Sequence, residues 1–478
     1  MNTKKSLVMV AGLAALFGGG TPAHSAEIFK NQDLTLNVGG RFKEIGELSY
    51  AEADDKRDMT RIYLWNTQDR IMLSGVYDGT KFSLEEALGG EAVNTSNNQI
   101  NLLEFMAVVP TFIDNVSIVA GQFKNPANRD SAEDSGYSFF TEKDMLQQMF
   151  FNAGYDTGVG LNARLGQVDV MAGTLAGAPD LPQRYLPEVL NQPMLYARIG
   201  WDNIGDDPFH PKAWGLAHPD GAQFAIHGNA MYMVDSNAGH STNASLGSGY
   251  FDAPSANSYY GNVLLSSKWN PYLGKTANGA NVEVDSTYGQ VSVDTQFRTA
   301  LGKESTLNIG AQATWSEYTA DNMAKGPNPF KLNGVTVNAA TIDLLGGQVY
   351  IAAETGTFDI AARAVVVVPS QGLMGNNGTT NGPANPIQYT PILPTGPIWD
   401  VTFPSVGWHV SKASKLTAEA TFEFNAPMDR ADDGAYSIAE MPSQVANNGI
   451  KTPASSHNYK FLSTPVLPIA RLEYQLQF

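Results

Sequence analysis

Side chains that could carry out chemistry are few in this sequence and form no recognisable motif. There is no cysteine, which excludes thiolate metal ligands, disulfides and a haem attached through two thiols. The seven histidines are scattered without metal-ligand spacing, so no metal site and no cofactor is expected. Gly274-Lys275-Thr276 lacks the first glycine of a phosphate-binding loop, and no nucleophile elbow is present. The sequence therefore does not predict an enzyme.

Basic side chains recur on the polar face of strand-like segments. If those segments form a barrel with its apolar face outward, eight basic residues face the lumen: Arg41, Lys43, Arg70, Arg164, Arg198, Arg298, Arg363 and Arg471. Such a row along a pore would attract anions. A structural interpretation is equally open, because charges must avoid lipid and inward acids such as Glu419 and Glu473 could pair with them across strands.

The elements that would position these residues are strands, and the last one is the clearest. From Ala470 onward, apolar and polar residues alternate without a break as far as Phe478. Side chains alternate between faces along a strand, so this segment has one apolar and one polar face. A terminal aromatic on such a strand is typical of outer-membrane barrels, and Phe478 is therefore predicted to be an assembly signal.

The start of the chain predicts export. Lys4 and Lys5 precede the apolar run 7–17, and the small residues Ala23 and Ser25 follow at the two positions that a signal peptidase reads. This pattern is typical of a signal peptide, expected to cover residues 1–25, with cleavage after Ala26 as the alternative. The run is too short for the roughly 20 residues of a membrane-spanning helix. A membrane location would then require a closed barrel formed by residues 26–478.

Composition and segment spacing agree with a barrel. The chain has 478 residues, is 43% hydrophobic and carries a formal charge of -17, an acidic balance that argues against a nucleic-acid partner. Strand-like segments run from end to end, joined alternately by short turns and long loops, as in outer-membrane barrels. We predict an all-β fold, a transmembrane antiparallel β-barrel of 16 strands. Eighteen strands are the alternative, because residues 257–300 could hold two strands or three.

The segment 124–155 stands out among the loops. It is long, and it combines charged residues with several aromatic rings, among them Phe139 and Phe140. Loops of this length in compact folds are usually functional or disordered, and the density of aromatic residues favours an ordered, packed segment.

Three stretches resemble the phosphate-selective porin O and P family: residues 119–126 (VAGQFKNP), 138–143 (SFFTEK) and 156–160 (DTGVG). The resemblance covers roughly residues 30–200 and the last strand. It implies a 16-stranded barrel, a homotrimer, and a third loop folded into the lumen as a constriction. Its candidate residues are Lys124, Arg129, Glu133, Asp134, Tyr137 and Lys143. The resemblance does not by itself imply phosphate, because this loop carries a net charge of -2.

These observations favour a porin in the outer membrane of a Gram-negative bacterium. It would contact outer-membrane lipid and pass small hydrophilic solutes or ions by passive diffusion, with weak selectivity and no high-affinity phosphate site. One alternative is a barrel that sheathes a periplasmic or membrane-crossing partner such as a multihaem cytochrome. Another is a secreted β protein outside the membrane.

Overall fold

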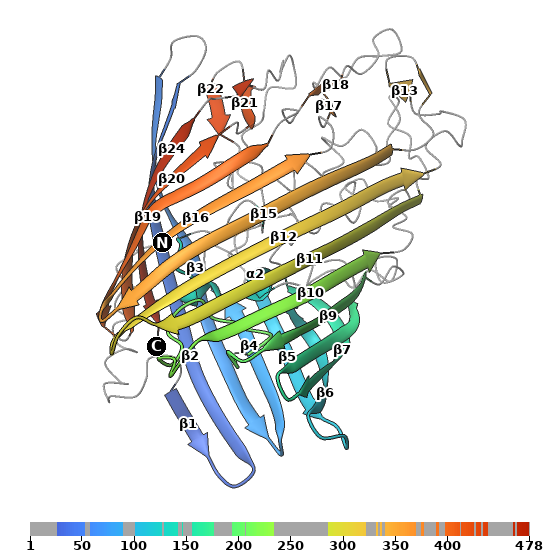
Figure 1. Ribbon diagram of the computed structural model, residues 1–478, viewed down its shortest axis with the longest axis vertical. Coiled ribbons are helices and arrows are strands. Elements are labelled where there is room, and N and C mark those ends of the chain that lie inside the picture. Colours follow the sequence, from blue (N-terminus) through green and yellow to red (C-terminus); the bar gives the residue numbers. More distant parts are fainter. Residues whose placement is uncertain are drawn as a thin grey trace.

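In the computed structural model the chain is a closed antiparallel β-barrel (Figure 1). The structure describes residues 26–52, 58–88, 101–126, 129–141, 146, 155–175, 194–205, 207–233, 285–321, 331–332, 335–336, 340–369, 374–376, 389–391, 397–411, 413–424, 427–431, 434–437, 462–463 and 466–477. The predicted signal peptide and Phe478 lie outside these ranges.

Sixteen strands form the wall, which confirms the first of the two predicted counts. They are β2 (Leu34–Glu52), β3 (Asp58–Tyr77), β4 (Thr80–Ala87), β5 (Asn101–Pro110), β6 (Val116–Lys124), β7 (Tyr155–Leu165), β8 (Val168–Leu175), β9 (Met194–Asp202), β10 (Gln223–Met233), β11 (Asp285–Ala300), β12 (Ser305–Asp321), β15 (Ala340–Thr355), β16 (Phe358–Pro369), β19 (Ile398–Ser411), β20 (Ser414–Phe424) and β24 (Leu467–Gln477). Each pairs with the next, and β24 closes the barrel by pairing with β2 from Ser49↔Ile469 to Arg41↔Gln477. The count is settled because β10 pairs directly with the single strand β11, residues 285–300, whereas residues 257–284 lie outside the described ranges.

Shorter elements complete the described fold. The strand β1 (Ala26–Lys30) pairs with the start of β2. Small two- and three-stranded sheets stand at the end of the barrel drawn uppermost in Figure 1. They are built from β13 (Lys331–Leu332), β14 (Val335–Thr336), β17 (Met374–Asn376), β18 (Tyr389–Pro391), β21 (Pro427–Ala431), β22 (Gly434–Ser437) and β23 (Leu462–Ser463). The helical turns α2 (Arg129–Ala132) and η2 (Ser135–Tyr137) follow β6. Among the described residues, no helix has the length and apolar character needed to cross a membrane.

Alternation along the strands places apolar residues outside and polar residues inside. On β12, Gln312, Thr314 and Ser316 are buried, while Trp315 between them is 39% exposed. Leu472 on β24 is 53% exposed and its neighbour Glu473 only 3%. A barrel surrounded by water would have polar residues outside and apolar residues inside. Because ring closure also pairs the wall strands with neighbours on both sides, the wall is suited to lipid, as in outer-membrane barrels.

The two ends of the barrel differ as the sequence predicts. At the lower end in Figure 1, connections such as 78–79, 166–167 and 356–357 are tight turns. At the upper end, long connections such as 125–154 and 370–397 join the strands. One connection at the short-turn end breaks this rule: residues 203–222, between β9 and β10, are far longer than the other turns there.

An arginine on the lipid-facing wall is the direct test of this orientation. We expect Val349→Arg, at an outward position 49% exposed in the spanning part of β15, to destabilise the folded barrel by about 2–4 kcal/mol. Leu301→Arg is the matched control, because Leu301 is 59% exposed but lies in a turn beyond the strands, where the cost is about 0–1 kcal/mol. Urea-induced unfolding in lipid vesicles measures both. Equal effects would contradict a wall embedded in lipid.

Candidate functional site

The connection between β6 and β7 covers residues 125–154, and its described residues 125–126, 129–141 and 146 fold into the barrel, as the family resemblance implies. We call it the inner loop. Its described part crosses to strands on the far side: the carbonyl of Gly136 accepts hydrogen bonds from Gln475 Nε2 (2.9 Å) and Gln477 Nε2 (3.1 Å) on β24. Ser405 Oγ on β19 donates to the carbonyl of Phe139 at 2.8 Å. Inward polar side chains of the wall thus hold the inner loop through its backbone.

A buried carboxylate, that of Glu419, holds the inner loop at Thr141. Thr141 donates to Glu419 on β20 through both its backbone nitrogen (3.0 Å) and its Oγ1 (2.9 Å). Lys43 Nζ on β2 donates to the carbonyl of Thr141 at 2.6 Å and lies 2.8 Å from Glu473 on β24. All four side chains are buried, so these charge-assisted bonds are shielded from water. They fix the inner loop against three adjacent strands of the wall.

An ion pair anchors the middle of the inner loop. Asp134 Oδ1 lies 2.5 Å from Arg41 Nη2 and also accepts from the backbone nitrogen of Gly136 at 3.0 Å. Burial alone would raise the pKa of Asp134, but the Arg41 guanidinium and Lys124 hold it well below its usual value. Glycine at 136 allows this approach, because an added Cβ would meet the Arg41 guanidinium and the Gln477 amide. Asp134 therefore stays ionised and bound to the wall at neutral pH.

Aromatic rings on the inner loop pack against the opposite wall. The rings of Phe139 and Phe140 each lie 6.3 Å from that of Tyr350 on β15. The guanidinium of Arg363 on β16 lies 4.3 Å from the centre of the Phe140 ring, within the range of a cation–π contact. Both phenylalanines are buried. The packed aromatic segment predicted from the sequence is present, in the interior of the barrel.

A second segment also folds inward, from the short-turn end. We call residues 203–222 the second inner segment. The carbonyl of Tyr137 in the inner loop accepts from the backbone nitrogens of Ala213 (3.2 Å) and Trp214 (3.0 Å). The Tyr137 and Trp214 rings lie 5.1 Å apart, and Lys212 Nζ lies 4.1 Å from the Tyr137 ring centre. The two segments therefore support each other inside the barrel.

The second inner segment is fixed to the wall by a histidine. His210 Nε2 lies 2.8 Å from Glu104 Oε2 on β5, and its Nδ1 lies 3.7 Å from Asp207. Burial lowers the pKa of His210, but the carboxylates of Glu104 and Asp207 outweigh that effect and hold the pKa well above its usual value. His210 is therefore positively charged at neutral pH, and its ion pair holds the segment to the wall.

This ion pair predicts a dependence of segment docking on pH. A raised pKa in the folded state means that the stabilisation is complete below about pH 6.5, the usual histidine value, and is lost as pH rises through the raised value. We expect a loss of about 1.5–3 kcal/mol, typical of a hydrogen bond to a charged group. Hydrogen exchange of backbone amides 207–215, corrected for intrinsic rates, should accelerate in that interval. In His210→Gln, exchange should be fast and free of this dependence, and an unchanged dependence would contradict the assignment.

The structure places all eight predicted inward cations inside the barrel, most of them engaged with neighbours. Four have carboxylate partners within 3.0 Å: Arg41 with Asp134, Lys43 with Glu473, Arg70 with Glu85, and Arg471 with Glu47. Arg298 Nε donates to Asn308 at 2.8 Å, Arg363 lies over Phe140, and Arg198 donates to the carbonyl of Pro126. Arg164, whose side chain is 35% exposed, lies 3.6 Å from Asp169. Cross-strand and loop pairing, the structural interpretation, accounts for most of the set.

Most of the predicted constriction residues are likewise bound to neighbouring groups of the protein. Lys124 Nζ donates to the carbonyl of Glu133 at 2.8 Å, and Arg129 Nη2 donates to the carbonyl of Lys212 at 3.3 Å. Asp134 and Tyr137 hold the inner loop to the wall and to the second inner segment. Lys143 lies outside the described residues. These side chains brace the inner loop from within.

The sequence did not reveal the second inner segment. Its Pro, Gly and Asp content is that of an ordinary connection, and only Phe209 and Trp214 hint at packing. Phe209 is 4% exposed and its ring lies 6.1 Å from that of Phe123 on β6. Large aromatic residues inside a long turn were the available signal.

Comparison with known proteins identifies the fold. No protein-family model matches the chain, and a search of curated proteins by sequence finds no match. An anion-selective porin from Comamonas acidovorans is 8% identical with a TM-score of 0.50, and the match covers 93% of this chain and all of the porin. OmpT of Vibrio cholerae (10% identity, TM-score 0.49) and the channel DcaP of Acinetobacter baumannii (10%, 0.47) each match over 95% of this chain and their full length. The fold is that of outer-membrane porins, and the lipid-facing wall places the chain in the outer membrane.

Proposed function

We propose that the chain is a porin through which small hydrophilic solutes and ions diffuse passively across the outer membrane. The observation that carries this proposal is the arrangement of the wall and of the two segments inside it. A closed wall, apolar outside and polar inside, surrounds two segments that are fixed to its inner face by hydrogen bonds and ion pairs. Fixed internal segments of this kind limit the size of the solutes that pass.

We propose that the channel is weakly selective. Fixed charges select ions only when their field extends into the permeation path, and the basic residues nearest the inner loop are compensated. Arg41, Lys43 and Arg471 each lie within 3.0 Å of a carboxylate. Pairs of opposite charge at such distances cancel over the about 8 Å that fields reach at physiological salt. The remaining potential gives a modest preference.

A high-affinity phosphate site is not part of the proposal, although the sequence resembles phosphate-selective porins. Tight phosphate binding needs several cationic donors converging on one anion. Here Lys43 Nζ is directed at Glu473 and the Thr141 carbonyl, and Lys124 Nζ at the Glu133 carbonyl. Protein oxygens already bind these ammonium groups, so phosphate would have to displace them.

The two inner segments argue against a sheath around a cytochrome. A partner threaded through the barrel would have to displace the inner loop from β19, β20 and β24, together with the second inner segment. We also propose that the chain forms a homotrimer and that residues 1–25 are removed on export. Cross-linking of the purified protein in detergent and determination of its mature N-terminus test them.

Uptake of neutral sugars into liposomes tests passive diffusion. Liposomes that contain the protein should swell in small sugars at rates that fall steeply with sugar size, because the two inner segments narrow the path. Protein-free liposomes are the control. Swelling that is equally slow for all sugars, with correctly inserted protein, would contradict a diffusion channel.

Selectivity can be tested with two arginines that differ in exposure. We expect Arg164→Gln to shift the reversal potential modestly toward cations, because the Arg164 side chain is 35% exposed. Arg198→Gln should leave the potential unchanged, because Arg198 is 2% exposed and directed at the Pro126 carbonyl. Reversal potentials in a salt gradient measure both. A larger shift from Arg198 than from Arg164, or anion current that saturates at micromolar phosphate, would contradict the proposed selectivity.

A further inference from the structure

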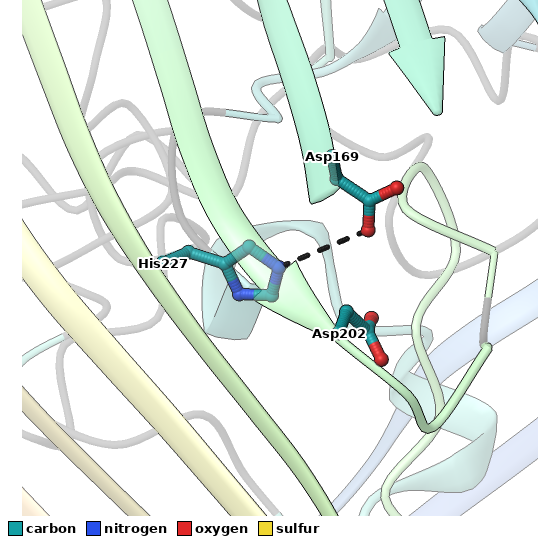
Figure 2. Close-up of side chains that lie close together, drawn as sticks. All are labelled: Asp169, Asp202 and His227. Carbon is teal, nitrogen blue, oxygen red and sulfur yellow. Dashed lines mark ion pairs between the residues drawn. The ribbon is translucent and has the colours of Figure 1, made fainter. Parts of the chain in front are cut away.

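Three inward side chains of the barrel wall converge at the short-turn end, and none of them belongs to the inner loop. Asp169 comes from β8, Asp202 from β9 and His227 from β10 (Figure 2). One ligand atom from each lies within 4.8 Å of the others, and the three residues are 4%, 3% and 0% exposed. Among the described residues this is the one such group of three histidine or carboxylate side chains.

Strand register brings these residues together. Gly200 on β9 pairs with Asp169 on one side and with His227 on the other, and His227 pairs in turn with Asp294 on β11. A Cβ on Gly200 would lie 2.2 Å from His227 Cδ2, so the imidazole fits there only because residue 200 is glycine. The ring thereby lies across β9, between the carboxylates of Asp169 and Asp294.

Hydrogen bonding to Asp294 determines what the histidine offers. His227 Nδ1 lies 3.2 Å from Asp294 Oδ1. The other carboxylate oxygen of Asp294, Oδ2, accepts a hydrogen bond from Asn229 Nδ2 at 2.8 Å. A carboxylate at Nδ1 requires the ring proton there, so the neutral imidazole presents a lone pair at Nε2. Nε2 is buried, has no hydrogen-bond partner, and faces Asp169 Oδ2 at 4.0 Å. A carboxylate behind the imidazole is the usual support of a metal-ligating histidine.

Neighbouring groups hold the two aspartates, and one oxygen of each lies within 4.8 Å of a ring nitrogen of His227. Asp202 Oδ1 accepts from the backbone nitrogens of Ile204 (2.7 Å) and Gly205 (3.1 Å), which fixes the side chain. Asp169 Oδ1 lies 3.6 Å from Arg164, while its Oδ2 faces the imidazole. Carboxylate oxygens this close to a bare imidazole nitrogen repel its lone pair, and a cation or a proton between them removes the repulsion.

We propose that Asp169, Asp202 and His227 bind a divalent transition-metal ion such as Zn²⁺, with water completing the coordination. Zinc binds imidazole nitrogen and carboxylate oxygen at about 2.0–2.2 Å, which separates tetrahedral ligands by about 3.4 Å. Binding would require the three side chains to rotate from their present spacing, within 4.8 Å, to that value. The mixed nitrogen and oxygen donors favour zinc over Ca²⁺ and Mg²⁺, which prefer all-oxygen sites. The ion would tie β8, β9 and β10 together where the second inner segment begins.

Metal titration of the untagged, detergent-solubilised barrel tests this proposal. After chelator treatment and dialysis, calorimetry with Zn²⁺ should show saturable binding of one ion per chain, unaffected by excess Ca²⁺. Co²⁺ should give visible absorption bands of a nitrogen- and oxygen-ligated site. His227→Gln should abolish both signals. His409→Gln should preserve them, because His409 is an inward histidine that contacts a different carboxylate, Asp359, at 2.8 Å.

Folding of each variant is checked by its heat-modifiable mobility on gels. If His227→Gln does not fold, Asp202→Asn replaces it, because its amide oxygen can still accept from Ile204 and Gly205 while the carboxylate ligand is lost. Absence of saturable zinc binding to the wild type would overturn the proposal. Wild-type zinc binding in the folded replacement variant would overturn it as well.

Discussion

We expect a variant in which a short Gly-Ser-Gly linker replaces residues 134–141 to conduct severalfold more current per channel than the wild type. These residues cross the interior from β6 toward β2, β20 and β24. Their removal should widen the proposed constriction, whereas the wall keeps its own strand pairing and should still insert. Single-channel recording measures the change.

A point variant separates this effect from general loosening of the loop. Ser405→Ala removes one hydrogen bond, to the carbonyl of Phe139, and leaves those to Gly136 and Thr141 in place. Its conductance should stay close to that of the wild type. If the shortened variant also conducts like the wild type, ions do not pass the inner loop, and the proposed constriction is wrong.

The second large effect is expected from deletion of Phe478. The closing strand β24 pairs with both β2 and β20, so the barrel cannot close until this strand is in place. The sequence predicts that the terminal aromatic directs this assembly. Deletion should sharply reduce the folded, heat-modifiable form in outer membranes.

Phe478→Tyr, which keeps an aromatic ring, should restore most of the folded form. Quantitative immunoblots of unheated membrane fractions measure all three proteins. Normal insertion of the truncated chain would remove the role assigned to Phe478.

The wall was predictable because alternation is a local property. Each strand carries its own pattern, and the outward residues Leu472 and Tyr474 could be identified without knowing their neighbours. The count of 16 required one further fact, that residues 285–300 form a continuous strand, which the pattern around Gly289 left ambiguous.

The interior was harder to predict because its contacts join distant residues. Thr141 and Glu419 are 278 positions apart, and Asp169 and His227 meet only because both pair with Gly200. The strand register decides which residues come into contact across strands. A bulge such as that between Lys43 and Glu44 shifts the register by one residue. Spacing along the sequence therefore indicated no metal site, although three candidate ligands converge in the fold.

Current through single molecules of the purified protein in a planar bilayer tests the central claim most directly. The account predicts discrete, stable conductance steps, a small reversal potential in a salt gradient, and no block by micromolar phosphate. Folded, inserted protein that produces no conductance steps would contradict the assignment of this barrel as a diffusion channel.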